Sequence, residues 1–200
     1  MAQLNLSKTR LTKEKANLAM YRQYLPSLDL KRQHLTAERN KTQARIGEIE
    51  AEIKRRVEGI GAAIPMLADE NIDLKGLVTL KAVKIDERSV VGQRLPNLEA
   101  VEVDVAGYGY LARPQWVDLV AERLKDILRL QVEARVTQQQ VALLDAATMK
   151  ITQRVNLFDK VLIPRAKDNI RRIEIALGDL ERSAVVNSKI AKRSGPREAT

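Results

Sequence analysis

Two long segments, one at each end of the chain, carry apolar residues that recur every seven positions, and this repeat constrains the fold more than any other feature. A stripe of this period, with charged residues between its members, is typical of a coiled-coil seam. In the N-terminal segment a continuous helix would be roughly 80 Å long. Because its apolar stripe must be covered, we expect it to pack against a partner helix. The stripe residues are Leu4, Leu11, Leu18, Leu25, Tyr21, Leu28, Leu35, Ile46, Ile49, Ile53 and Ile60.

The C-terminal segment has a similar stripe, whose spacing changes near a proline. Val120, Ile127, Ala134, Val141, Val155 and Leu162 form one row, and Leu130, Leu144, Ile151 and Phe158 form the next. After Leu162 one extra four-residue step is inserted, and Pro164 lies inside it. Such a stutter locally unwinds a coiled coil, and a proline is tolerated best where a helix already bends. Two interpretations remain: one continuous kinked helix, or a helix that ends near Ile163 and another that begins at Pro164. Pro26 allows the same two interpretations, a kinked helix or two separate helices, in the N-terminal segment.

The middle of the chain, residues 61–115, has a different pattern. Its first part is rich in glycine and predicts a break with one short helix. The stretches "LVTLKAVKI" and "LEAVEVDV" predict two short strands, and the turn-rich "DERSVVGQRLPN" connects them. We therefore expect a β-hairpin near residues 77–106.

These patterns predict a mainly α fold, with a long antiparallel two-helix coiled coil and a short β-hairpin region in the middle. The predicted divisions are an N-terminal helix (1–60), the middle segment (61–115), a C-terminal helix (116–193) and a disordered tail (194–200). If Gly59 lies near Asp118, a constant register places Pro164 near Glu14 and Pro26 near Thr152.

Catalytic and metal-binding signatures are missing from the sequence. There is no cysteine, which excludes disulfides and Cys-ligated zinc, and His34 is the single histidine. "GYGY" is not followed by the Gly-Lys-Ser/Thr of a phosphate loop, and no nucleophile elbow is present. We therefore predict no catalytic, cofactor-binding or metal-binding residue, no cofactor and no enzymatic activity. No apolar run reaches the ~18 residues of a membrane helix, and the N-terminus has no apolar signal core, so we expect a cytoplasmic protein without direct membrane insertion.

The charge is unevenly distributed along the chain. The formal net charge of +9 divides into +6 for residues 1–60, −2 for 61–115 and +5 for 116–200. Basic arms raise the alternative of a coiled coil that binds nucleic acid or acts as a scaffold. Against nucleic acid, the arms have no interleaved aromatic residues for base stacking, and their basic residues alternate with acidic ones. Basic arms of this kind would also bind an acidic surface on another protein.

Two segments resemble the D subunit of the V/A-type rotary ATPases, in a divergent bacterial branch. The first is "LNLSKTRLTKEKANLAMYRQYLPSLDLKRQHL", although its "YLPSLDL" departs from the shorter-spaced version of many members. The second is "QRVNLFDKVLIPRAKDNIRRIEIALGDLERSAVVNSKIAKR". In it, the residues that match the family pattern are Arg154, Val155, Asn156, Ile163, Pro164, Arg165, Ile170 and Ile173.

The resemblance implies the central rotor shaft of a proton- or sodium-translocating ATPase or ATP synthase, peripheral to the cell membrane through its complex. The implied partners are the catalytic A and regulatory B subunits of a hexamer, an F subunit along the shaft, and a funnel-shaped subunit at the membrane-ring end. Torque transmission would need a stiff seam, for which we predict Leu18, Leu25, Ile46, Ile53, Ile127, Val141, Val155 and Leu162. Exchangeable charge contacts with the hexamer are predicted for Lys8, Arg10, Lys13, Arg165, Lys167, Arg171 and Arg172.

Overall fold

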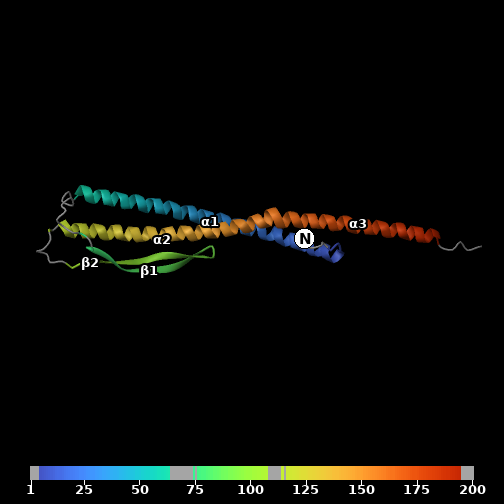
Figure 1. Cartoon of the computed structure of the whole chain (residues 1–200), viewed down its shortest axis with the longest axis horizontal. Coiled ribbons are helices and arrows are strands. Elements are labelled where there is room, and N and C mark those ends of the chain that lie inside the picture. The colour runs from blue at the N-terminus through green and yellow to red at the C-terminus, as the bar shows by residue number, and fades with distance from the viewer. Residues whose placement is uncertain (1–4, 64–73, 75, 108–113, 115, 195–200) are drawn as a thin grey trace, which may run out of the picture. The chain divides into compact units, whose positions relative to one another are not determined.

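The computed structural model describes residues 5–63, 74, 76–107, 114 and 116–194, and consists of long helices and one β-hairpin (Figure 1). The elements are α1 (Lys8–Ala63), β1 (Val78–Val90), β2 (Gln93–Val105), α2 (Trp116–Leu157), the π-helical turn η2 (Phe158–Leu162) and α3 (Ile163–Ser194). The predicted fold class is therefore confirmed. The short helix predicted after Gly59 and the predicted tail lie outside the described residues, except that α1 extends to Ala63 and Ser194 is the last residue of α3.

The chain divides into two compact units, which are described one at a time. The terminal unit comprises Met1–Lys31 and Ile151–Thr200, and the central unit comprises Arg32–Lys150.

In the central unit, α1 and α2 run antiparallel, and ion pairs mark their register. Arg39 pairs with Asp145, and Arg56, further along α1, pairs with Asp126, which is earlier in α2. The core between the helices includes Leu35, Ile49 and Leu144, each no more than 2% exposed. The apolar residues face the partner helix at the spacing that the heptad pattern predicts.

In the terminal unit, α1 is again antiparallel to the C-terminal helical path. The rings of Tyr21 and Phe158 meet edge to face, with centroids 5.5 Å apart. Lys15 forms an ion pair with Glu174. The predicted constant register agrees with the contact between Tyr21 and Phe158. It places Lys15 opposite Ile163, however, and is therefore wrong beyond Phe158, where the register shifts.

Neither proline breaks its helix. Pro26 lies within α1, which continues unbroken through it. Pro164 is the second residue of α3, directly after η2, and the path from Trp116 to Ser194 has no gap. In η2 the Ile163 N–H donates to the Phe158 carbonyl, five residues back. The interpretation of separate helices is wrong, since a π turn accommodates the proline that an α-helix interior would disfavour.

The π turn also changes which residue faces the partner helix. It inserts one residue into the helical path, so the buried position after Val155 is Ile163, at 8% exposure. The heptad count predicts Leu162 at this position, but Leu162 is only half-buried.

The β-hairpin lies where the sequence predicts it, but its strands are longer than predicted. Pairing continues to Val90 opposite Gln93, so the residues predicted as a long connection belong largely to the strands. The turn consists of Val91 and Gly92, both with positive φ (53° and 76°), as in the two-residue turns that match strand twist. The pairing is interrupted at Lys81 in β1 and at Glu99 in β2, which have no partner in the register.

Candidate interaction surfaces

The predicted seam residues lie at or near the helix interfaces of their units. Four of them are buried, namely Ile46, Ile127, Val141 and Val155, and four are half-buried, namely Leu18, Leu25, Ile53 and Leu162. In the central unit Ile127 clusters with Ile60 and Val120, and Ile53 packs against this cluster. Other residues, such as Leu35, Ile49 and Leu144, are more deeply buried, so the predicted seam is one part of the apolar packing of these units.

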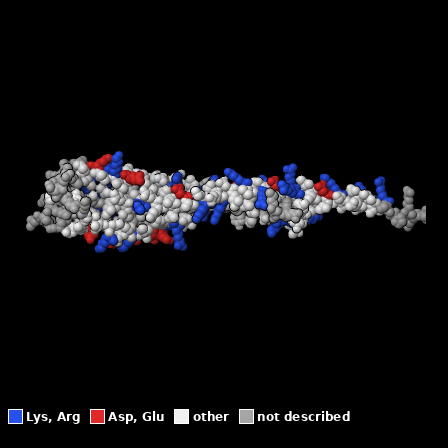
Figure 2. All heavy atoms as spheres, viewed as in Figure 1, with Lys and Arg blue, Asp and Glu red and all other residues white. Residues whose placement is uncertain are grey.

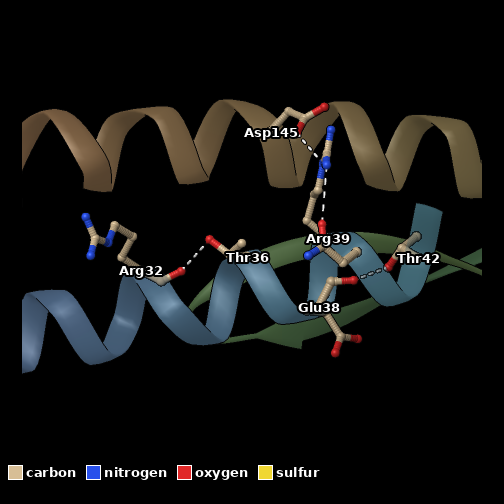
Figure 3. A network of polar contacts seen from close by, with 7 residues as sticks. Arg32, Thr36, Glu38, Arg39, Thr42 and Asp145 are labelled. Atoms are coloured by element: carbon tan, nitrogen blue, oxygen red, sulfur yellow. Dashed lines mark hydrogen bonds and ion pairs between the residues drawn. The ribbon is translucent and has the colours of Figure 1, made fainter. Parts of the chain in front are cut away.

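Arginines on α1 of the central unit reach across to acids on α2, which the sequence reasoning missed. Arg39 Nε lies 2.8 Å from Asp145 Oδ1, and Figure 3 shows its side chain extending from one helix to the other. Arg45 and Glu133 are 2.9 Å apart, and Arg56 and Asp126 are 2.8 Å apart. Each exposed pair contributes only about 0–1 kcal/mol, but together the pairs fix the register of α1 on α2.

Intrahelical contacts complete this polar network. The Thr36 hydroxyl donates to the Arg32 carbonyl, and the Thr42 hydroxyl donates to the Glu38 carbonyl (Figure 3). Thr42 is 8% exposed, so this bond satisfies a hydroxyl within the interface. The sequence signal for the arginine bridges is weak, because the partners become visible only when the antiparallel register is known.

The bridges change the acid–base properties of their members. The hydrogen bond to Glu133, followed by its charge, raises the pKa of Arg45 above its ordinary value. The hydrogen bond from Arg56 is the main cause that lowers the pKa of Glu52, and the charge of Arg55 adds to it. Arg56 itself has a raised pKa, mainly through Glu52. All of these groups therefore stay charged over a wider pH range than they would in isolation.

The residues predicted to contact a hexamer lie in the terminal unit, three on α1 and four on α3. All are exposed except Arg10, which is half-buried and lies 2.7 Å from Glu14. Lys8 lies 3.6 Å from Glu181. Within the described part of the chain no ion pair is formed by Lys13, Arg165, Lys167, Arg171 or Arg172. These five cations are therefore available to an external partner.

Glu14 is a buried carboxylate that the sequence reasoning did not single out. It is 5% exposed and belongs to the same helix as its partner Arg10. A buried carboxylate needs a charged or hydrogen-bonding partner, so Arg10 is held to Glu14 and is less available to a second protein than Lys13.

The described residues hold no cluster of metal-binding side chains. No group of three or more His, Cys, Asp or Glu residues there could hold a metal ion. His34 is exposed on α1. Among the same residues, no helix combines the length and the hydropathy needed to cross a bilayer. Figure 2 shows basic and acidic side chains interspersed over the visible face of the described residues.

The fold is that of a paired-helix protein that carries a β-hairpin. The family model for the D subunit of ATP synthase matches residues 10–193, so the chain belongs to that family. It is 35% identical to the V-type ATP synthase D subunit of Borreliella burgdorferi over 194 residues, which are 97% of this chain and 96% of the relative. It is 28% identical to the V-type ATP synthase D subunit of Chlamydia pneumoniae over 196 residues, covering 96% and 92% of the two chains. The corresponding protein of Chlamydia muridarum is 27% identical over 197 residues, 96% of each chain.

Proposed function

We propose that this chain is the central rotor shaft of a V/A-type ion-translocating ATPase or ATP synthase, a structural subunit with no catalysis of its own. The observation that carries the proposal is a family match that extends over both paired-helix segments and the hairpin. In this role the shaft transmits torque between the catalytic A/B hexamer and the membrane ring. An F subunit binds along the shaft, and a funnel-shaped subunit contacts its membrane-ring end, so the protein is peripheral to the membrane through its complex.

The packing of the helices supports a mechanical role. A shaft must resist twisting, and two helices joined by a seam and by lateral bonds resist it better than one. In the central unit the arginine bridges at Arg39, Arg45 and Arg56 provide such bonds at intervals along α1. Each bond is exposed and weak, but rotation of one helix against the other would break several of them together.

The exposed cations of the terminal unit support a contact that can be exchanged. A rotor meets successive subunit pairs, and a set of tightly packed apolar contacts would hold it at one angle. Charge contacts at an exposed surface are weaker, act over a longer distance and are screened by salt. Lys13, Arg165, Lys167, Arg171 and Arg172 are therefore the strongest candidates for contacts with the hexamer.

Purification from native cells tests the proposal. An affinity tag on the chain should recover the A, B and F subunits from detergent-solubilised membranes in stoichiometric amounts. Vesicles with the assembled complex should pump ions on addition of ATP, and a complex assembled without the chain should not. Recovery of nucleic acid in place of ATPase subunits would favour the alternative of a nucleic-acid-binding coiled coil.

A further inference from the structure

The β-hairpin is attached to α2 at two places, one at its base and one near its tip. At the base of the hairpin, Leu77, Val117 and Ala121 form a buried cluster, with Val78 and Val105 packed against it. The Ala106 N–H also donates to the Leu77 carbonyl over 2.9 Å. The base is thus held to α2 by several apolar side chains, while the backbone bond joins the two ends of the hairpin to each other.

The attachment near the tip includes one side-chain hydrogen bond and one buried leucine. Gln140 Nε2, on α2, donates to the Pro96 carbonyl. The neighbouring Leu95 is 4% exposed, and it is the only buried residue of β2. Pro96 has no N–H, so β2 has one backbone donor fewer at this position.

The two attachments are separated by most of the hairpin length. From Val105 to Pro96 a strand spans about 30 Å, and from Ala121 to Gln140 a helix spans about 28 Å. These matching lengths agree with Figure 1, in which the hairpin runs beside α2. The hairpin is therefore laid along the helix and fastened at both ends.

Between the attachments the hairpin does not pack closely on the helices. A cavity of about 800 Å³ lies there, bounded by residues 97–101 of β2 and by side chains of α1 and α2. Its walls include charged groups of both signs, among them Lys41, Arg45, Glu48 and Glu133. Polar walls favour water over apolar packing, so the middle of the hairpin contributes little to its attachment.

The pairing of the strands supplies a bending point at the same level. Lys84 pairs with Ala100 and Ile85 pairs with Leu98, so Glu99 is an extra residue in β2. A bulge of this kind interrupts the ladder and allows the strand to bend. It divides the hairpin into a basal half, which is held by the apolar cluster, and a distal half of residues 85–98, which is held at Leu95 and Pro96.

We propose that residues 85–98 form a releasable strap, latched to α2 by the bond from Gln140 to Pro96 and by burial of Leu95. The strap opens by bending at the Glu99 bulge while the basal half stays in place. Opening uncovers Leu95 and the side of α2 around Gln140, and it enlarges the cavity toward solvent. This is a local opening of the central unit, independent of any assembly that the chain enters.

Hydrogen exchange of the isolated full-length chain tests the latch. In Gln140→Ala the amides of residues 85–98 should exchange up to about tenfold faster. A distal half that has left α2 is an unsupported two-stranded ribbon, and such a ribbon is marginally stable, so its own ladder opens more often. Amides of residues 78–84 and 100–105, and those of α1 and α2, should be unchanged. Gln139→Ala is the matched control, because Gln139 is an exposed neighbour of the same type. Unchanged exchange in residues 85–98, or faster exchange over the whole hairpin, would overturn the proposal.

The distance between the strap and α2, measured with spin labels, gives a second and independent test of strap opening. The chain has no cysteine, so Ser89→Cys and Ala146→Cys, both at exposed positions, can be spin-labelled selectively. The distance distribution between the labels should be broader in the Gln140→Ala background than in the Gln139→Ala background. Identical distributions in the two backgrounds would show that Gln140 does not hold the strap. Because both experiments use the chain alone, their outcome does not depend on the rotor proposal.

Discussion

At the scale of single residues, the arginines of α1 determine more of the central unit than their exposure suggests. Arg56 contacts two carboxylates, Glu52 on its own helix and Asp126 on α2, each at 2.8 Å. One guanidinium therefore supports α1 and also links it to its partner. Its planar group of several donors suits this double role, which a lysine ammonium fills less well.

Glu52 provides a pH-dependent test of this network. Its pKa in the folded state is lowered, mainly by the hydrogen bond from Arg56. A lowered pKa means stabilisation that is present above the unfolded value of about 4.3 and is lost as the pH falls through the folded value. Glu52→Gln should therefore lower the Tm at pH 7 by about 1–2 °C, and this difference should decrease as the pH falls through the folded value.

Glu50→Gln is the control for this experiment, because Glu50 is exposed and has no ion pair with another described residue. Thermal unfolding followed by circular dichroism from pH 3 to pH 8 measures both variants. A Glu52→Gln difference that does not decrease toward pH 3 would show that the effect is not due to the charge.

At the scale of secondary-structure elements, the sequence predicts the helices well and their irregularities poorly. The heptad rows identify Ile46, Ile127 and Val141 correctly as interface residues, because helical periodicity is local and repeats many times. The shift from Leu162 to Ile163 was not predicted. The spacing of apolar residues locates the change in the stripe. It does not specify a π turn, because periodicity carries no information on the backbone bond from Ile163 to Phe158.

For the surface residues, too, local sequence pattern predicts exposure, whereas contacts between distant residues depend on the tertiary fold. The exposure of Lys13 and Arg165 follows from their positions outside the stripe, which the sequence displays. The bond from Gln140 to Pro96 joins residues 44 positions apart. No periodicity links them, so this contact becomes visible only when the hairpin is placed along α2.

The π turn itself makes a prediction about deletions. Removing Asp159 together with Pro164→Ala should convert η2 into an ordinary α turn, and the spacing from Val155 to Ile163 then becomes seven residues, so the stripe stays in phase. The Tm of this variant should equal that of the wild type or exceed it by a few degrees.

Deletion of the exposed Gln153, which lies in regular α-helix, is the matched control. It removes one residue where no π turn can compensate for the altered helical phase. The helix that follows therefore rotates by about 100° relative to its partner. The Tm should fall by about 10 °C or more. If the two deletions destabilise the chain equally, the π turn does not adjust the phase of the stripe.

Deletion of the hairpin tests how far the helices depend on it. Replacement of residues 78–105 by a short linker removes Val78 and Val105 from the cluster around Leu77 and Val117. The seam and the arginine bridges do not involve the hairpin. Helical circular dichroism per residue should therefore remain nearly intact, with a loss of a few degrees in Tm, and the ATPase rate of a reconstituted complex should change.

Melting of the helices in the hairpin deletion would show that the hairpin is part of their core. An unchanged ATPase rate in a complex of normal composition would show that the hairpin has no role in coupling. A variant with the wild-type hairpin and Gln139→Ala controls for the effect of altering the exposed surface of α2.

At the scale of the whole molecule, the groups that stabilise the fold differ from the unpaired cations that are proposed to attract a partner. Stability comes from the seam of each unit and from paired charges, whereas the unpaired cations of α3 contribute little to it. A chain with a net charge of +9 nevertheless creates a field that attracts acidic partners. Removal of selected cations should therefore separate stability from assembly.

The decisive variant replaces Arg165, Lys167, Arg171 and Arg172 by Gln. Helix propensity stays nearly constant, and none of the four forms an ion pair with another described residue, so the isolated chain should melt within a few degrees of the wild type. Assembly with the A/B hexamer should weaken at low salt. Its salt dependence should become flatter, because four charges that attract the partner are gone. Titration of fluorescent chain with hexamer at several salt concentrations measures both effects.

The matched control replaces four exposed cations of the central unit, Lys81, Arg123, Arg135 and Lys150, by Gln. Both variants lower the net charge by the same amount, so a general charge effect would weaken assembly equally in the two. A loss confined to the α3 variant would place the contact on that helix, since only the position of the charges differs. If the α3 variant assembles and turns over like the wild type at every salt concentration, these residues form only a solvated face, and the contact with the hexamer must lie elsewhere on the chain.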